Sequence, residues 1–135
     1  MSYTYAPSAR VRAADSTYRI LSAFPIAAFT LTVVTDIAYW QTANLQWLHF
    51  SEWLLFAGIV FAGLAGLVRL LGGIRFPWPY YVAGLVVLVL ATLNNFIHTA
   101  DGITAVMPYG LTVSVLTVIA MCVTAFFGRI GVRHV

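Results

Sequence analysis

Four long apolar stretches separated by short polar segments constrain the fold of this chain more than any other feature. Each stretch holds about 20 mostly apolar residues, the length an α-helix needs to cross a hydrocarbon core roughly 30 Å thick. The predicted helices run over about 19–40, 50–71, 79–98 and 108–128. Only 8% of the 135 residues are charged and 61% are hydrophobic, which excludes a water-soluble domain, where about 25% are charged. We therefore predict an all-α membrane protein, a four-transmembrane-helix antiparallel bundle in a lipid bilayer.

The short length and the lack of a polar linker indicate one transmembrane domain, 1–135, with residues 1–18 as a cytoplasmic tail. Arginines precede the first apolar stretch, as they do in signal peptides. The stretch is too long for one and lacks a small-residue cleavage site, so we expect it to be retained. Pro25 removes a helical hydrogen bond near Leu21, which predicts that the first helix begins around Phe24 or kinks there.

The basic residues predict the orientation of the bundle. All seven are arginines, and they occur in three short clusters beside the apolar stretches, which is typical of topology signals and not of a nucleic-acid-binding surface. The clusters are Arg10, Arg12 and Arg19, then Arg69 and Arg75, then Arg129 and Arg133. After four crossings all three clusters fall on one face, and basic segments favour the cytoplasm. Both termini are therefore predicted to be cytoplasmic.

The opposite, periplasmic face is predicted to collect the remaining ionisable residues of the spans and loops. These are Asp36, His49, Glu52, His98 and Asp101. Ionisable groups at such depth usually face a bundle interior or a cavity. His49 and Glu52 are spaced i,i+3, and both Asn94 and Asn95 lie within one helical turn of His98, so each set shares a helix face. Because antiparallel helices bring these ends together, the set can converge on one polar site.

Several interpretations of this polar site stay open. His49 and His98 could be axial ligands of a haem b, since neutral imidazole is a usual haem ligand. The mixture of imidazoles and carboxylates could instead hold a divalent metal, or it could form a protonation-dependent site. Alternatively, the histidines are interfacial residues satisfied by neighbouring polar groups. Asp36 in that case is a cap or hydrogen-bond partner for a loop over 41–48.

Small residues and aromatic residues add expectations about packing and depth. Gly58, Ala62 and Gly66 recur at i,i+4 in the second helix, which favours close packing inside the bundle, although the same stripe could support a homo-oligomer. Aromatic residues near the helix ends are expected in two interfacial belts. The outer belt would hold Tyr39, Trp40, Trp47 and Trp53, and the inner belt Trp78, Tyr80 and Tyr81.

The chain has no signature of an ordinary enzyme. There is no phosphate-binding glycine loop, no nucleophile elbow and no zinc motif. Its single cysteine, Cys122, can form neither an intrachain disulfide nor a cysteine-pair metal site. We expect a non-enzymatic role.

Two groups of residues resemble a bacterial family of four-helix membrane proteins catalogued as a domain of unknown function. The first group is Phe24-Pro25-Ile26-Ala27, Thr35-Asp36-Ile37-Ala38-Tyr39-Trp40, Thr42-Ala43, Trp47, Phe50-Ser51 and Trp53-Leu54-Leu55. The second is Asn94-Asn95-Phe96-Ile97-His98, Asp101, Pro108, Gly110-Leu111 and Ser114. The resemblance implies a location in the bacterial inner membrane and points to Asp36, His98 and Asp101. It also implies a partnership in electron delivery with a periplasmic PQQ-dependent sorbosone-type dehydrogenase, beside which members of the family are often encoded.

The chain departs from the family pattern at two places. Members tend to have an arginine before the aspartate that follows the third helix, where this chain has Ala100. Many have a histidine near the start of the third helix, where this chain has Trp78, Tyr80 and Tyr81. A haem held by that family histidine is therefore not expected here.

The leading hypothesis from these observations is an accessory membrane subunit whose periplasmic polar site engages a redox partner or a cofactor in electron transfer. The first alternative is a proton or small-molecule channel or carrier in which Asp36 and Glu52 titrate. The second is a structural membrane scaffold.

Overall fold

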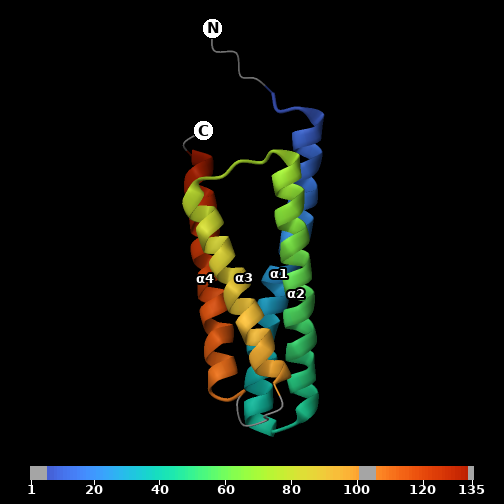
Figure 1. Ribbon diagram of the computed structural model, residues 1–135, viewed down its shortest axis with the longest axis vertical. Helices are drawn as coiled ribbons and strands as arrows, with labels where there is room; N and C mark the ends of the chain where they lie inside the picture. The colour runs from blue at the N-terminus through green and yellow to red at the C-terminus, as the bar shows by residue number, and fades with distance from the viewer. Residues whose placement is uncertain (1–5, 101–105, 134–135) are drawn as a thin grey trace.

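The computed structural model describes residues 6–100 and 106–133, and within these ranges all regular secondary structure is helical. The helices are α1 (Ala9–Thr42), α2 (Leu45–Gly72), α3 (Trp78–Thr99) and α4 (Tyr109–Arg133). All four are long and apolar enough to cross a membrane. They run up and down beside one another (Figure 1), as predicted for a four-helix antiparallel bundle.

The first helix is longer at its start than the sequence predicted. α1 begins at Ala9 instead of near residue 19, because the Ser8 side chain caps the helix by accepting a hydrogen bond from the backbone N–H of Val11. Much of the predicted tail is therefore helical. The helix continues through Pro25, so the first of the two alternatives, a helix that begins around Phe24, was wrong.

The predicted loop between the first two helices is nearly absent. α1 ends at Thr42 and α2 begins at Leu45, with Ala43 in the left-handed region at φ 52°. Asn44 then caps α2 by accepting a hydrogen bond from the backbone N–H of Gln46 at 3.0 Å. Since the segment 41–48 is almost entirely helical, Asp36 cannot act as the partner of a loop there.

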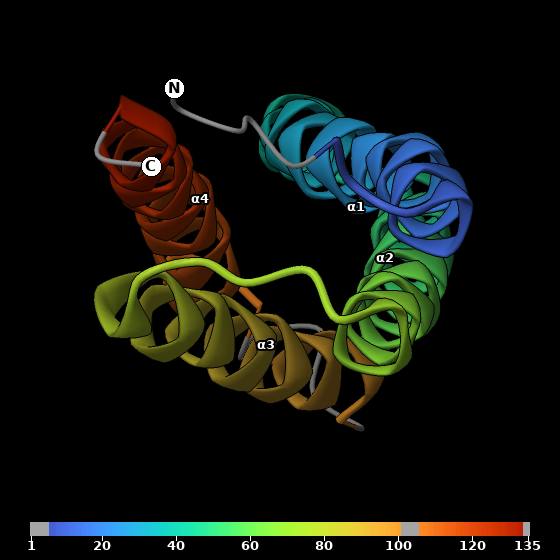
Figure 2. The same ribbon diagram turned by 90° about the horizontal axis from the view of Figure 1, so that it is seen from above.

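Seen from above, the helices form a ring in the order α1, α2, α3, α4 (Figure 2). Contacts are most numerous within the two hairpins, α1 with α2 and α3 with α4, and fewer between them. Buried positions recur every three or four residues, for example Leu48, Ser51, Leu55 and Gly58 in α2. This spacing is that of left-handed helix bundles. Many large apolar side chains point outward and are exposed, as expected of a surface covered by lipid.

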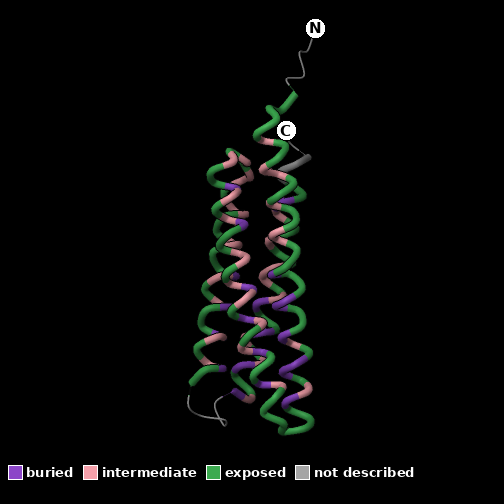
Figure 3. The backbone as a smooth tube through the Cα atoms, turned by 90° about the vertical axis from the view of Figure 1, so that its right-hand side faces the viewer, coloured by how far each residue is buried: buried purple, intermediate pink, exposed green. Residues whose placement is uncertain are grey.

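The two ends of the bundle differ. The start of α1, the connection between α2 and α3, and the end of α4 lie together (Figure 1), and we call this the arginine end because every cluster of arginines falls there. The opposite end holds the turn at Ala43 and Asn44. Buried residues concentrate in the half of the bundle toward the opposite end (Figure 3), so the helices pack most tightly there.

The aromatic belts are only partly as predicted. Trp40, Trp53 and Trp78 are exposed on the outer surface, where a membrane interface could receive them. Tyr39 is instead buried against Leu48. Its assignment to the outer belt was wrong because it lies on the inward face of α1, one helical turn after Asp36.

Candidate functional site

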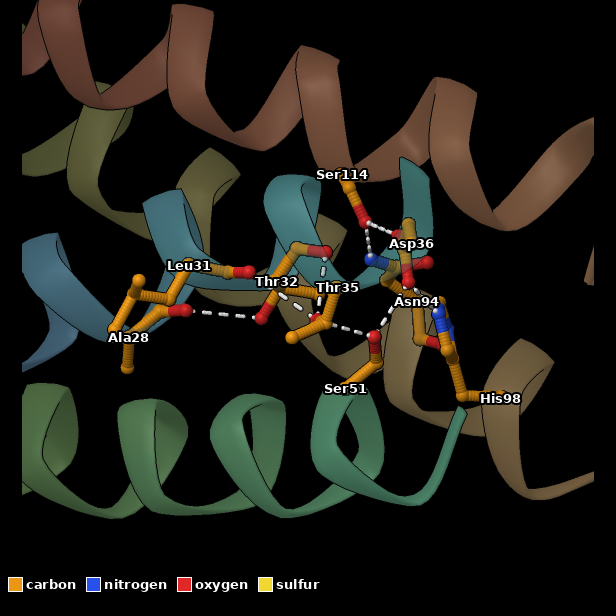
Figure 4. A network of polar contacts seen from close by, with 9 residues as sticks. All are labelled: Ala28, Leu31, Thr32, Thr35, Asp36, Ser51, Asn94, His98 and Ser114. Carbon is orange, nitrogen blue, oxygen red and sulfur yellow. Dashed lines mark hydrogen bonds and ion pairs between the residues drawn. The ribbon is translucent and has the colours of Figure 1, made fainter. Parts of the chain in front are cut away.

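One buried polar cluster takes side chains from all four helices. It contains Asp36 from α1, Ser51 from α2, Asn94 and His98 from α3, and Ser114 from α4, each at most 1% exposed. These side chains point toward one another (Figure 4). Polar groups in a membrane interior have no water to bond, so their partners must come from the protein. The cluster therefore ties the four helices together.

The carboxylate of Asp36 is the centre of the cluster. Its Oδ1 accepts a hydrogen bond from the Ser51 hydroxyl at 2.6 Å and lies 2.7 Å from His98 Nε2. Its Oδ2 accepts from the Ser114 hydroxyl at 2.6 Å. Each of the other three helices thus supplies one partner to a single side chain of α1.

A second layer of hydrogen bonds holds those partners in place. The side-chain amide of Asn94 donates to the Ser114 hydroxyl at 2.7 Å, and the hydroxyls of Thr35 and Ser51 lie 2.7 Å apart. His98 Nδ1 is 2.9 Å from the backbone carbonyl of Asn94, one turn earlier in α3. This contact orients the imidazole so that Nε2 faces α1.

The two contacts of His98 fix the number of protons that the Asp36 and His98 side chains hold together. A carbonyl oxygen can only accept, so Nδ1 must carry a hydrogen. Nε2 and Asp36 Oδ1 are at hydrogen-bond distance, so a second hydrogen lies between them, on the nitrogen or on the oxygen. In either arrangement the Asp36 and His98 side chains together have no net charge. Loss of that hydrogen would leave a net negative charge in a site that water does not reach, which is unfavourable.

Apolar residues close the cluster on both sides along the bundle axis. Toward the opposite end lies the group of Tyr39, Leu48 and Val106. Toward the arginine end lies a larger group, Phe29, Leu55, Val87 and Ala91. The low dielectric constant of these apolar surroundings strengthens every hydrogen bond within the cluster.

The other predicted polar residues do not join the cluster. His49 and Glu52 pair with each other, with 3.2 Å between Nδ1 and Oε2, and the side chain of His49 is 63% exposed. Asn95 is half-buried, and its Oδ1 has no hydrogen-bond partner among the described residues. Asp101 lies outside the described residues.

The contacts of His49 and His98 bear on whether the site could hold a haem or a metal ion. His49 and His98 have separate partners, and both nitrogens of His98 are already in hydrogen bonds. An iron ligated by His98 would have to displace Asp36 or the Asn94 carbonyl. Within residues 6–100 and 106–133, no group of three or more His, Cys, Asp or Glu side chains is placed to hold a metal ion.

The small-residue stripe of α2 divides into two parts. Gly58 is buried, and a β-carbon there would collide with the ring of Phe29 in α1, so this glycine lets the two helices approach closely. Ala62 and Gly66 instead line a cavity. Internal packing thus fits Gly58, and a homo-oligomer stays a prediction.

Sequence reasoning did not select the hydroxyl residues Ser51, Ser114 and Thr35 as site residues. One signal was available in α1, where Thr32, Thr35 and Asp36 share a face with Tyr39 at helical spacing. The two serines were marked only as members of the family pattern, because small polar residues in membrane helices commonly serve close packing alone.

A family model described as a predicted membrane protein, DUF2231, matches residues 20–134. The chain belongs to this family. The matched range contains the whole polar cluster, and the match confirms the resemblance to a membrane family of unknown function. Comparisons with curated proteins and with solved structures gave no match.

Proposed function

We propose that this DUF2231 protein is a proton-responsive membrane subunit in which the Asp36 and His98 pair binds and releases one proton. The observation that carries the proposal is a buried carboxylate and imidazole, 2.7 Å apart, that hold one hydrogen between them. An ionisable pair inside a membrane span is energetically demanding and is usually retained for function.

Protonation of this pair is coupled to helix packing in the proposal. Asp36 contacts side chains of α2, α3 and α4 at once. When the pair is neutral, the four helices pack around it. When the proton leaves, the buried negative charge favours separation of the helices or entry of water. A change in pH would thus become a change in the packing of the bundle.

The surroundings favour proton exchange with the opposite end. His98 is the penultimate residue of α3, whereas several helical turns separate it from the arginine end. The buried hydroxyls of Thr32 and Thr117 hydrogen-bond to carbonyls of their own helices, and the apolar group around Phe29 lies in the same direction. A proton site that exchanges at one face fits this arrangement better than a pore or carrier.

Stability as a function of pH tests the proposal. We expect the wild-type bundle to lose stability as pH rises, because the pair then loses its proton and keeps a buried charge. Asp36→Asn should remove that loss, since its amide can donate to His98 Nε2 and its oxygen can accept from Ser114 with no proton to release. The measurement is resistance to unfolding by sodium dodecyl sulfate across a pH series, together with the ¹⁵N signals of His98.

The other titratable groups described near that end, His49, Glu52, Tyr39 and Tyr109, need a control. Glu52→Gln should keep a loss of stability with rising pH, because Glu52 contacts the exposed His49 and acts on His98 only through a charge interaction weaker than that of Asp36. If the wild-type protein and Asp36→Asn show the same dependence of stability on pH, the proposal is refuted. The structural scaffold is then the remaining interpretation. Asp36-dependent proton flux across liposomes would instead support a channel.

We further propose that the arginine end faces the cytoplasm of a bacterial inner membrane, in keeping with the positive-inside rule. Fusions of alkaline phosphatase and of a fluorescent protein after Val135 should give fluorescence and no phosphatase activity. A fusion in the turn at Ala43 should give the reverse, and phosphatase activity at the C-terminus would contradict this orientation. The partnership with a periplasmic PQQ-dependent dehydrogenase stays a prediction.

A further inference from the structure

A second buried polar group lies near the arginine end and belongs to no part of the Asp36 cluster. Arg69 of α2 is 4% exposed. Its guanidinium carbon lies 4.0 Å from the ring centre of Phe76, 4.2 Å from that of Tyr80 and 4.3 Å from that of Tyr81. The hydroxyls of Tyr80 and Tyr18 hydrogen-bond to each other beside it. Aromatic rings from α1, α3 and the α2–α3 connection therefore surround the cation.

The charge of Arg69 is stabilised, but some of its hydrogen-bond donors are not satisfied. Aromatic faces attract a guanidinium, and the group keeps its proton in proteins. Its Nε and Nη2 are buried without a hydrogen-bond partner among the described residues. Among the described residues, no ion pair includes Arg69. Buried donors of this kind are rare in native proteins and call for a partner.

Arg69 also lines a cavity of about 580 Å³ between the two hairpins. Beyond Tyr18 and Tyr80 the cavity runs toward the bundle centre, where Phe29 and Val87 form part of its wall. Its wall there is apolar. Open space remains beside Gly84, since no atom lies within 4 Å of a β-carbon built there. The volume falls in the range of about 300–1,000 Å³ that is usual for small-molecule sites.

We infer that this cavity binds a single-chain anionic amphiphile, with its carboxylate or phosphate against Arg69 and its acyl chain along the apolar wall. A neutral chain would leave the buried cation without an anion. A free inorganic anion would leave the apolar part unfilled. An amphiphile bound this way has its head near the arginine end and its tail toward the bundle centre, which is the orientation of a lipid in one leaflet.

Binding can be measured on the full chain in phosphatidylcholine nanodiscs by native mass spectrometry with four probes. Oleate and 1-oleoyl-lysophosphatidate should each bind one molecule per chain. Methyl oleate should bind about tenfold more weakly or worse, because its ester carries no charge and cannot form charge-assisted hydrogen bonds with Arg69. Inorganic phosphate should not compete at equal concentration. Equal binding of methyl oleate and oleate, or displacement of oleate by phosphate, would overturn the inference.

Two variants with matched controls locate the site. Arg69→Gln should weaken oleate binding about tenfold or more, whereas Arg75→Gln, at an exposed arginine of the same end, should not. Gly84→Leu should also weaken binding by filling the cavity, whereas Gly63→Leu, which faces open space outside the cavity, should not. Unchanged binding in Gly84→Leu would refute this location even if Arg69→Gln fails to fold. Asp36→Asn should bind oleate normally, so failure of the proton proposal and failure of this one are distinguishable.

Discussion

Asp36→Ala is expected to destabilise the bundle by about 3–5 kcal/mol, the effect of removing one partner from a buried ion pair. The alanine removes the acceptor of the Ser51 and Ser114 hydroxyls and the hydrogen-bond partner of His98 Nε2. A single interhelical hydrogen bond in a membrane protein contributes only about 0.6 kcal/mol on average. Ser51→Ala and Ser114→Ala should therefore each have a much smaller effect than Asp36→Ala, which removes three contacts at once.

The measurement is the free energy of unfolding in mixed micelles of sodium dodecyl sulfate and a mild detergent, followed by circular dichroism. Asp15→Ala is the matched control, because Asp15 forms an exposed pair with Arg19 at 2.8 Å and such pairs contribute about 1 kcal/mol at most. If Asp36→Ala unfolds at the same detergent fraction as Asp15→Ala, the cluster does not hold the helices together.

Gly58→Leu is expected to force α1 and α2 apart and to destabilise the bundle by about 3 kcal/mol, at the upper end of the usual range for overpacked cores. The ring of Phe29 occupies the space that a β-carbon at Gly58 would need, and Phe29 is itself buried against Leu55 and Val87. The ring can therefore move aside only by losing these contacts. Since α1 carries Asp36 and α2 carries Ser51, separation of these helices should also weaken the polar cluster.

A double-mutant cycle identifies the cause. Phe29→Ala combined with Gly58→Leu should recover part of the lost stability, because the leucine can occupy the volume that the ring vacates. Gly63→Leu, which meets no atom within 4 Å, should be close to wild type in the same unfolding assay. Equal losses of stability in Gly58→Leu and Gly63→Leu would indicate a general effect of replacing glycine in α2 and not a clash at the interface between α1 and α2.

The number of helices could be predicted from local sequence patterns, but their exact boundaries could not. The number of spans and their approximate positions follow from runs of apolar residues, because crossing a bilayer requires a minimum length of apolar helix regardless of tertiary contacts. The ends were less predictable. α1 begins at Ala9 and continues through Pro25, and α2 begins at Leu45, since capping by Ser8 and Asn44 extends helices into segments that are not apolar.

The polar site was predictable in its centre and not in its composition. Asp36, Asn94 and His98 were selected from the sequence because an intramembrane carboxylate or imidazole must find an interior partner. The prediction that His49 and Glu52 share a helix face was also correct, but they pair with each other at the rim. Which groups meet depends on how each helix is rotated about its axis and on the depth at which neighbours align.

The sequence by itself determined that this is a four-helix membrane protein with its arginines at one end, because both properties depend on residue type and chain order alone. Only the tertiary structure decided which hydroxyls reach across to another helix. Thr30 and Thr42 hydrogen-bond to carbonyls of their own helix, whereas Ser51 and Ser114 reach Asp36. A hydroxyl in an apolar helix can satisfy itself in either way. Which acceptor it uses depends on whether the neighbouring helix brings a polar atom within about 3 Å. No pattern within one helix contains that information.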